Sequence, residues 1–455
     1  MGGSSFYQIL NKIGNRVPTV TDPQYFKKAF NTIQQMISDE LILAGHDISA
    51  GGLITTLLEM NFPNIATGME LDLSCFAESD LVKILFSENP GIIIQVSGEN
   101  VRKVKKYFTY NEITFLELGK VSEHRSLKIR FHNTNLEVDI DAMRTAWYKT
   151  SYLLDINQSG TALALQRYTN YGKQPLKLTF PQTFTGRTGT LQVDLSRRKK
   201  SKINAAIIRE KGINGDREMA YSLYTAGFNV KDVHMTDLIT GRETLEEIHF
   251  IVFPGGFSNS DVLGPARGWA GAFLYNEKAQ TALDKFYQRQ DTLSLGVCNG
   301  CQLVVALDLL YPDHPEKPVM QHNDSHKFES AFLSVKVLEN KSVMLHSLAG
   351  AELGIWVAHG EGKFKFPYEE NKYHIPVKYC YKEYPGNPNG SDYDAAALCS
   401  QDGRHLAIMP HLERAVFPWQ WGYYPEERKE DEITPWLEAF VNAREWIKER
   451  TNIAF

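Results

Sequence analysis

The pattern of apolar and polar positions predicts a mixed first region and a weaker second one. Within residues 1–120, apolar residues recur at helical spacing from Tyr25 to Leu43, and the apolar run from Gly91 to Val96 predicts a strand. This mixture is typical of an α+β domain. Residues 121–200 have scattered Gly and Pro and one short helical run near Ala142 to Leu154, which indicates a connector. We interpret its basic run, Arg197 to Lys200, as a solvated linker rather than a binding patch.

From residue 201 to residue 455 the pattern changes to apolar runs that alternate with helical stretches. Strands are predicted at Ile203 to Ile208, His249 to Phe253 and Thr292 to Val297, with a helix from Asp216 to Ala226. Such alternation predicts an α/β domain with a parallel sheet flanked by helices. Ligands of these folds bind at the carboxyl ends of the strands, so residues that follow the strands are the first candidates for a site.

Composition and charge narrow the class of protein. A length of 455 residues with 43% hydrophobic and 23% charged residues indicates a globular protein of two or three domains. The 49 basic and 54 acidic side chains give a net charge of −5, which gives no reason to expect nucleic acid or a membrane as partner. No apolar run approaches the roughly 18 residues of a spanning helix, and no signal peptide pattern is present, so we expect a cytoplasmic protein. Five cysteines, an odd and sparse set, predict reduced thiols.

One of these cysteines lies in a segment with the form of a nucleophile elbow, Gly296-Val297-Cys298-Asn299-Gly300. It lies between a predicted strand and the apolar helical run from Gln302 to Leu310. A sharp turn from strand to helix exposes the middle side chain, and the helix N-terminus favours the thiolate form of Cys298. Two alternatives remain. Cys298 and Cys301 form a Cys-x-x-Cys pair that could bind metal or act in redox chemistry, although no second ligand pair is found, and Cys298 could be a buried structural cysteine.

A thiol nucleophile needs a base, and His411 with Glu413 offers one. Both follow the predicted strand Leu406 to Met409, and residues two apart in an extended segment face the same side. The imidazole would then shuttle a proton while the carboxylate fixes its tautomer. Taken alone, a His-x-Glu pair is more often a surface pair.

Glycines follow another predicted strand in Pro254-Gly255-Gly256-Phe257-Ser258. Glycines let backbone N–H groups approach a ligand closely, so this segment and the N–H of Asn299 are candidates for an oxyanion hole. A plain tight turn is the alternative.

Together and in this order, the Gly-Gly turn, the elbow and the His-x-Glu pair resemble the triad (class I) glutamine amidotransferases. A closer resemblance, over about residues 201 to 447, is to the glutaminase domain of the phosphoribosylformylglycinamidine synthase family. It rests on Asn214-Gly215, Asp232 to Leu238, Gly255 to Ser258, Asp261 to Gly264, Gly296 to Gln302, His359 to Gly362, Asn387 to Ser391 and Trp419 to Trp421. The segments Met1 to Ser5, Leu43 to Leu53 and Phe86 to Gly91 resemble the last domain of the family's synthetase half.

The resemblance implies a fold and a set of site residues. The fold is a flavodoxin-like glutaminase preceded by an α+β domain similar to the C-terminal domain of aminoimidazole ribonucleotide synthetase. Implied catalytic residues are Cys298, His411 and Glu413. Implied oxyanion or glutamine-binding residues are Gly255, Gly256, Phe257, Asn299, Gln302, His359, Gly360 and Glu361. The implied synthetase-domain motif is His46, Asp47, Ser49, Gly51 and Gly52, which taken alone could equally be a helix cap and a turn. No metal ligands are expected.

The function that the resemblance implies is glutamine-dependent ammonia supply for the ATP-driven conversion of formylglycinamide ribonucleotide to its amidine, a step of purine synthesis. Implied partners are L-glutamine and upstream synthetase domains of the same polypeptide, so we expect this chain to be a C-terminal fragment. ATP and Mg²⁺ would act in the full enzyme, with no tightly bound cofactor here. The alternatives are another ATP-dependent amidoligase and a non-catalytic module on the same fold. Leu412, where the family usually has Pro, and Ala331, where it has Arg, depart from the pattern.

Overall fold

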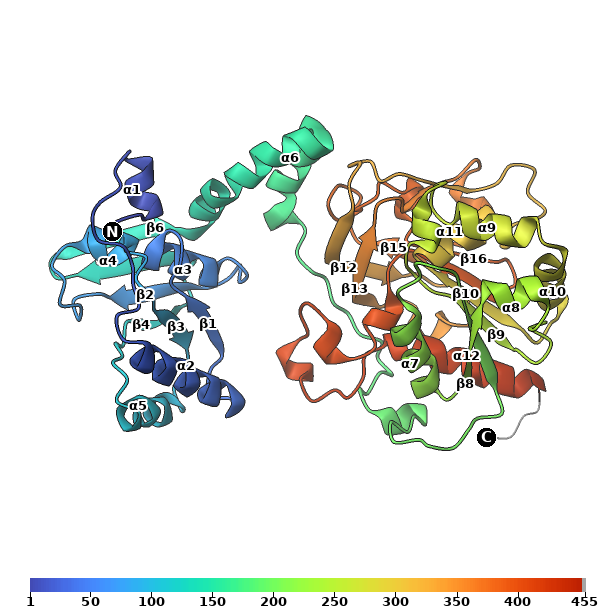
Figure 1. Cartoon of the computed structure of the whole chain (residues 1–455), viewed down its shortest axis with the longest axis horizontal. Coiled ribbons are helices and arrows are strands. Elements are labelled where there is room, and N and C mark those ends of the chain that lie inside the picture. The colour runs from blue at the N-terminus through green and yellow to red at the C-terminus, as the bar shows by residue number, and fades with distance from the viewer. Residues whose placement is uncertain (452–455) are drawn as a thin grey trace. The chain divides into compact units, whose positions relative to one another are not determined.

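The structure is a computed structural model that describes residues 1–451. The chain divides into two compact units, Met1–Ser151 and Tyr152–Phe455 (Figure 1). No helix of the described residues is both long and apolar enough to cross a membrane.

The first unit is an α+β domain with two sheets. A two-stranded antiparallel sheet contains β1 (Ala44–Asp47) and β3 (Ile92–Gln95), and a four-stranded sheet has the order β4-β2-β5-β6. The strands of the larger sheet are β2 (Gly68–Asp72), β4 (Gly119–Ser122), β5 (Ser126–Phe131) and β6 (Thr134–Asp139). The helices are α1 (Ser5–Ile9), α2 (Pro23–Ser38), α3 (Gly52–Asn61), α4 (Leu81–Phe86) and α5 (Val101–Tyr110). The predicted α+β character is therefore confirmed.

The first unit extends beyond the boundary predicted at residue 120. Strand β5 pairs in parallel with β2, and β6 pairs with β5, so residues 126–139 belong to the sheet of this unit. The sequence carries the signal, because Leu127, Ile129 and Phe131 are buried and alternate with the more exposed Lys128 and Arg130. Period-two alternation of this kind marks a half-buried strand, and the prediction of a connector overlooked it.

Helix α6 (Ile140–Asn170) is much longer than the helical run predicted from Ala142 to Leu154. Gly160 interrupts it with a φ of 76° and a ψ of 162°, which is not a helical conformation. Glycine tolerates this backbone because it has no Cβ. The boundary between the two units, after Ser151, lies within α6.

The second unit is built on a six-stranded sheet with the order β16-β17-β10-β9-β7-β8. Its strands are β7 (Asn204–Arg209), β8 (Asn229–His234), β9 (Phe250–Phe253), β10 (Leu293–Val297), β16 (Ala397–Cys399) and β17 (His405–Ile408). All neighbours pair in parallel except β16, which is antiparallel to β17. When the five parallel strands are numbered in chain order, their spatial order is 2-1-3-4-5, which is the order of the flavodoxin-like fold. The predicted fold is confirmed.

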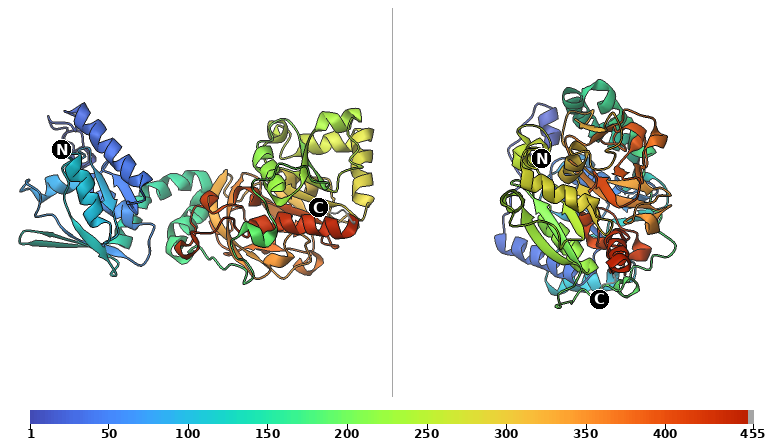
Figure 2. Two further views of the ribbon diagram at one scale, coloured as in Figure 1. Left: turned by 90° about the horizontal axis from the view of Figure 1, so that it is seen from below. Right: turned by 90° about the vertical axis from the view of Figure 1, so that its right-hand side faces the viewer.

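Helices cover both faces of this sheet (Figures 1 and 2). Helix α7 (Asp216–Ala226) packs against α12 (Trp436–Thr451), and α7 has the bounds that the sequence predicted. The other layer contains α8 (Met235–Thr240), α9 (Arg267–Leu274), α10 (Glu277–Gln288) and α11 (Asn299–Ala306). A second, antiparallel sheet has the order β13-β12-β15, from β13 (Glu352–His359), β12 (Glu329–Val337) and β15 (Val377–Tyr379), and a ribbon pairs β11 (Val319–Gln321) with β14 (Lys363–Lys365).

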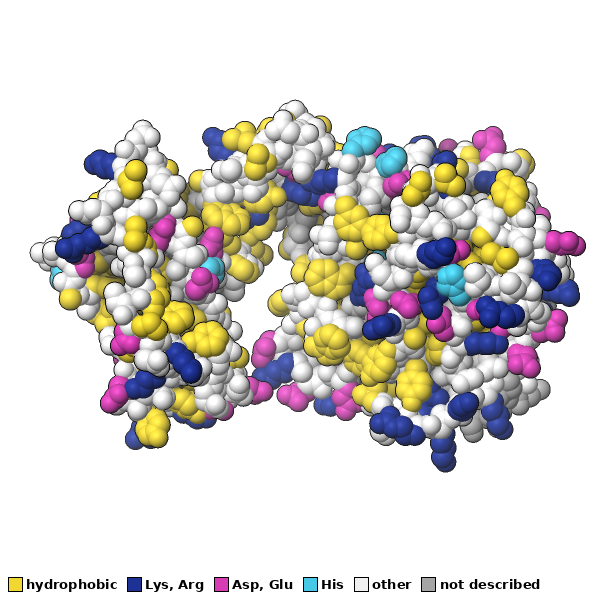
Figure 3. All heavy atoms as spheres, in the orientation of Figure 1, with side chains coloured by type: hydrophobic (Ala, Val, Ile, Leu, Met, Phe, Trp, Pro, Cys, Tyr) yellow, Lys and Arg dark blue, Asp and Glu magenta, His cyan; other side chains and the backbone are white. Residues whose placement is uncertain are grey.

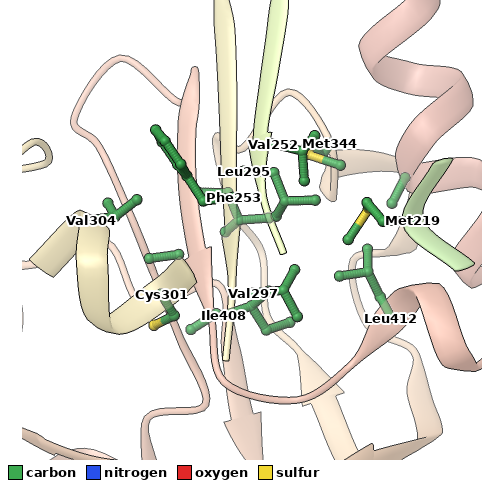
Figure 4. Close-up of a cluster of buried hydrophobic side chains, with 14 of the residues drawn as sticks. Met219, Val252, Phe253, Leu295, Val297, Cys301, Val304, Met344, Ile408 and Leu412 are labelled. Carbon is green, nitrogen blue, oxygen red and sulfur yellow. The ribbon is translucent and has the colours of Figure 1, made fainter. Parts of the chain in front are cut away.

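The core of the second unit lies on both sides of the parallel sheet. Val252, Leu295, Val297 and Ile408 come from three adjacent strands, and all four are fully buried (Figure 4). Parallel strands buried on both faces read as continuous apolar runs rather than alternating ones. For this reason the sequence pattern predicted the ends of these strands to within one residue in most cases.

Candidate functional site

Cys298 occupies the turn between β10 and α11, at the carboxyl end of a central strand. Its backbone has a φ of 52° and a ψ of −106°, a conformation that residues with a Cβ rarely adopt. A Cβ on Gly296 would lie 2.5 Å from the carbonyl oxygen of Gly300, and a Cβ on Gly300 would lie 1.8 Å from that of Phe253. Both flanking residues must therefore be glycine. The backbone of the predicted nucleophile elbow is present, but Cys298 is buried, 6% exposed, and not exposed as predicted.

His411 and Glu413 follow β17, the neighbour of β10 in the sheet. The Nδ1 atom of His411 lies 2.7 Å from Oε1 of Glu413, and only 2% of the histidine side chain and 0% of the glutamate side chain is exposed. The backbone N–H of His411 donates to the carbonyl of Trp356 at 2.8 Å. The pair meets as predicted, but for another reason. The segment is not an extended strand, because residues Leu412–Arg414 form a 3-10 turn that brings the carboxylate back to the ring.

The charge on Glu413 dominates the electrostatics of His411. Burial acts to lower the pKa of His411, but the Glu413 carboxylate and the Cys298 thiol outweigh burial and raise the pKa to about 9. The Cys298 sulfur donates to the carbonyl of Ala358 at 3.5 Å. Within residues 1–451, Nε2 of His411 has no hydrogen-bond partner. The ring nitrogen on the thiol side is thus free to exchange a proton.

Gly255 explains how the thiol and the ring come together. A Cβ built on Gly255 would lie 2.6 Å from Cε1 of His411 and 3.2 Å from Cβ of Cys298. Real Cβ atoms do not approach a ring this closely, since packing at such distances is repulsive. The absence of a side chain at position 255 therefore creates the space in which Cys298 and His411 lie.

Two backbone N–H groups beside the thiol are free to bind an oxyanion. In the described part of the chain, neither the Gly256 N–H nor the Asn299 N–H donates to another protein group. Gly256 has a φ of 152°, and a Cβ there would lie 2.6 Å from the Cα of Ile213, so this position also requires glycine. The N–H of Phe257 differs, because it donates to the carbonyl of Gly212 at 2.9 Å.

The side chains of Asn299 and Gln302 connect the elbow to the segment after β13. Asn299 accepts from the N–H of Ser258 at 3.1 Å and donates to Gln302 at 2.9 Å. Gln302 in turn donates to the carbonyl of Glu361 at 2.7 Å. Both side chains are buried, so their hydrogen bonds connect the 255–258 segment to the 359–361 segment beside the thiol.

His359, which precedes Gly360 and Glu361, is a buried neutral histidine near His411. Burial, together with the positive charge of His411, lowers its pKa to about 3. Neither ring nitrogen has a hydrogen-bond partner among the residues described. A Cβ on Gly362 would lie 2.5 Å from its Nδ1 atom, so this glycine makes room for the ring.

The Cys-x-x-Cys alternative finds no support in the geometry. Cys301 is fully buried on α11, and burial raises the pKa of its thiol well above the ordinary value. All five cysteines are free thiols. The described residues contain no group of three or more His, Cys, Asp or Glu side chains that could hold a metal ion.

The N-terminal motif forms a separate cluster within the first unit. His46 and Asp47 lie in β1 and do not cap a helix. Gly51 ends the turn as the N-cap residue of α3, and Gly52 is the first residue of that helix, with φ values of 87° and 75°. Ser49 lies in the same loop, and its carbonyl accepts from Gly52. The Nε2 atom of His46 lies 3.2 Å from Glu59. The cap interpretation is therefore wrong for His46 and Asp47, and the turn interpretation is right.

Glu88, which was not predicted as a functional residue, links the three N-terminal segments of the resemblance. Its Oε1 atom accepts from the backbone N–H groups of Ser5 and Gly51, each at 2.8 Å. Partial burial acts to raise the pKa of Glu88, but these N–H groups lower it overall. A lone glutamate in a loop gives no sequence signal for such a role.

Comparisons with known proteins identify relatives of both units. Residues 202–447 match the family described as CobB/CobQ-like glutamine amidotransferase domain, and residues 1–132 match the C-terminal domain of AIR synthase related proteins. A probable phosphoribosylformylglycinamidine synthase, chloroplastic/mitochondrial, of Arabidopsis thaliana is 37% identical over 472 residues, which cover 98% of this chain and 33% of that protein.

The phosphoribosylformylglycinamidine synthase of Homo sapiens is 36% identical over 484 residues, which cover 99% of this chain and 35% of that protein. The chain thus spans about a third of the length of these curated relatives. The solved structure of PurLQS from Thermotoga maritima is 23% identical and superposes with a TM-score of 0.42 over 55% of this chain and 99% of that one. Since the first family match extends over more than half of the 455 residues, the chain belongs to the family of CobB/CobQ-like glutamine amidotransferases.

Proposed function

We propose that the second unit hydrolyses L-glutamine with Cys298 as nucleophile, His411 as acid and base, and Glu413 as the group that orients His411. One observation carries the proposal. A buried His411–Glu413 pair, 2.7 Å apart, lies beside a cysteine held in a strained elbow. This arrangement of nucleophile, base and orienting carboxylate is recognised by geometry and roles, and it supports acyl transfer.

In the first half-reaction the Cys298 thiolate attacks the side-chain carboxamide carbon of glutamine. A carbon–sulfur bond forms, and the carbonyl oxygen takes up negative charge that the N–H groups of Gly256 and Asn299 stabilise. His411, protonated by the shift of its pKa to about 9, gives a proton to the leaving nitrogen as the carbon–nitrogen bond breaks. Ammonia leaves, and a thioester remains on Cys298.

In the second half-reaction His411, now neutral, takes a proton from a water molecule that attacks the thioester carbon. The same two N–H groups hold the second oxyanion. The carbon–sulfur bond breaks, glutamate leaves, and the thiolate is restored. Glu413 keeps the Nδ1 proton of His411 in place through both steps, so Nε2 always faces the thiol.

For the complete protein we propose that the ammonia serves the ATP-driven conversion of formylglycinamide ribonucleotide to the amidine. Relatives with the name phosphoribosylformylglycinamidine synthase that align over nearly all of this chain support this assignment. ATP and Mg²⁺ would act on parts of the longer relatives that this chain does not span. For the chain alone we expect glutamine hydrolysis that is weak and uncoupled, with no tightly bound cofactor and no nucleic acid or membrane partner.

Glutamate release from glutamine, measured with the purified chain, tests the glutaminase assignment. We expect Cys298→Ala to abolish release and Glu413→Gln to lower kcat by about a hundredfold or more, because the altered side chain favours the wrong tautomer of His411. The control is Cys75→Ala, which removes an exposed thiol of the first unit and should have no effect. Release that survives Cys298→Ala would falsify the assignment.

A further inference from the structure

Within the second unit, a largely buried network of charges connects the last part of α6 to residues at and just before the start of β12. Asp155 is 8% exposed, and its Oδ1 atom accepts from Nζ of Lys327 at 2.5 Å and from Ser159 at 2.7 Å. Arg167 donates to Glu329 at 2.8 Å and also hydrogen-bonds to Tyr384. Two carboxylates and two cations thus neutralise one another away from water, where breaking a pair is strongly unfavourable.

Asp155 and Arg167 of α6 pair with Lys327 and Glu329, and these two partners flank Phe328 in the sequence. Lys327 and Glu329 both point into the network through their ion pairs, and their side chains are only 18% and 6% exposed. Phe328, which immediately precedes β12, is half exposed and contacts other residues.

Phe328 contacts the segment of residues 255–258, which we call the oxyanion loop. Its ring centroid lies 6.1 Å from that of Phe257, with the ring planes tilted by 34°. A Cβ on Gly360 would lie 4.0 Å from the Phe328 ring, so the ring also lies over the segment that follows His359. Phe257 is bonded directly to Gly256, whose N–H is one of the two free oxyanion donors.

We propose that Phe328 is a positioning residue for the oxyanion loop, and that the 155–170 segment holds Phe328 in place through the ion pairs of its two sequence neighbours. The inference rests on the proposed glutaminase function. The backbone of Cys298 has constraints of its own, because it lies between two glycines, one in β10 and one in α11, that admit no side chain. Loss of the Phe328 ring should therefore weaken oxyanion stabilisation and leave the reactivity of the thiol unchanged.

The test uses the whole 455-residue chain and two rates. Phe328→Ala should lower kcat for glutamate release about tenfold, with KM within about twofold, since the oxyanion donors act on the transition state more than on bound substrate. The rate of alkylation of Cys298 by iodoacetamide should stay within about twofold. Phe328→Tyr keeps the ring and should restore kcat. Tyr275→Ala, which removes an exposed aromatic ring elsewhere on the same unit, is the control.

The ion pairs are tested by Lys327→Met, with Lys336→Met as the matched control, because Lys336 of β12 also pairs with a carboxylate, Glu352, at 3.8 Å. Lys327→Met should lower kcat about as much as Phe328→Ala does, and the double variant should be no slower than either single one, since both act through the same ring. Additive losses would overturn the coupling between network and ring.

Two outcomes separate this inference from the proposed function. A wild-type kcat in Phe328→Ala, or a raised KM with an unchanged kcat, would overturn the positioning role. The proposed function would still stand if Cys298→Ala is inactive. Glutamate release in Cys298→Ala would remove the function itself. Phe328 is half exposed, so its substitution does not depend on refolding of a core.

Discussion

At Gly255 the main chain approaches both reacting side chains, and this contact shows what a single residue contributes to the site. The glycines of this turn were expected to expose backbone N–H groups. That explanation holds for Gly256, but at Gly255 the decisive contact is with the ring of His411. This contact joins segments that are far apart in the chain, so the residues around position 255 do not predict it. The residue types of the site were predictable, whereas this reason for one of them was not.

Gly255→Ala tests the steric role of this residue. The new Cβ would push the ring or the thiol away by several tenths of an ångström or more, and a misplacement of about 1 Å lowers rates by about a hundredfold. We expect kcat to fall by that order in the glutamate-release assay. Gly189→Ala is the control, because a Cβ there meets nothing within 4 Å. Equal activity of the two variants would contradict the steric account.

Two buried histidines, His359 and His405, make the second unit sensitive to acid. The pKa of each is lowered to about 3 from 6.5, for His359 by burial and the charge of His411, and for His405 by burial and the charge of Arg404. Below pH 6.5 the unfolded chain binds protons that the folded chain does not, so the free energy of unfolding falls as the pH falls towards 3.

Urea unfolding between pH 7 and pH 5 measures this effect. Each histidine should contribute a slope of up to about 1.4 kcal/mol per pH unit below its unfolded pKa. His405→Gln should reduce the slope, whereas substitution of the exposed His322 by Gln should leave it unchanged. A steeper slope in His405→Gln would show that the sign of the linkage is wrong.

At the scale of elements, the strand–turn–helix of β10 and α11 was the most predictable part of the molecule. Its apolar strand, its glycines and its helix all have local causes, so the sequence contains them. Strand β5 was missed although its buried apolar residues alternate with more exposed ones, and β6 was missed because most of its residues are exposed at the edge of the sheet, where it pairs with β5. Helix α6 was predicted too short, since its last turns are held by the buried charges around Asp155 and not by an apolar stripe of their own.

A pair of helical glycines tests how tightly α11 packs against the sheet. Gly300→Ala would place a Cβ 1.8 Å from the carbonyl oxygen of Phe253, so we expect a loss of about 1–3 kcal/mol or more in the free energy of unfolding. Gly271→Ala in α9 would meet the ring of Tyr275 at an ordinary 3.8 Å. That variant should be stabilised by up to about 1 kcal/mol through helix propensity. Thermal melting compares the two, and similar melting temperatures would refute the packing argument.

At the scale of the whole molecule, the chain consists of two units, each with a hydrophobic core of its own. Apolar side chains also lie on the surface of both units (Figure 3), among them Phe26, Phe30 and Ile37 of α2 in the first unit. The second compact unit begins at Tyr152, because Asp155 and Arg167 belong to it by contact, whereas the family match begins at residue 202, next to the boundary predicted at residue 200.

Two shortened chains test where the second unit begins. A chain that starts at Tyr152 keeps the ion pairs of Asp155 and Arg167, and we expect it to fold and to release glutamate. A chain that starts at Tyr171 leaves Lys327 and Glu329 without these partners, so it should lose about 3–5 kcal/mol of stability. Urea midpoints of the two chains measure the difference. Equal midpoints would mean that residues 152–170 are not part of the folded unit.

The backbone at Cys298 has a consequence for how stability and activity oppose each other in this protein. A φ of 52° with a ψ of −106° is disfavoured by about 1–3 kcal/mol for any residue that has a Cβ, and only glycine avoids that penalty. Cys298→Gly should therefore melt at a higher temperature than the wild type while it releases no glutamate. Selection for thermal stability alone would remove the thiol from this position, so its presence in an unfavourable backbone conformation is evidence of selection for chemistry.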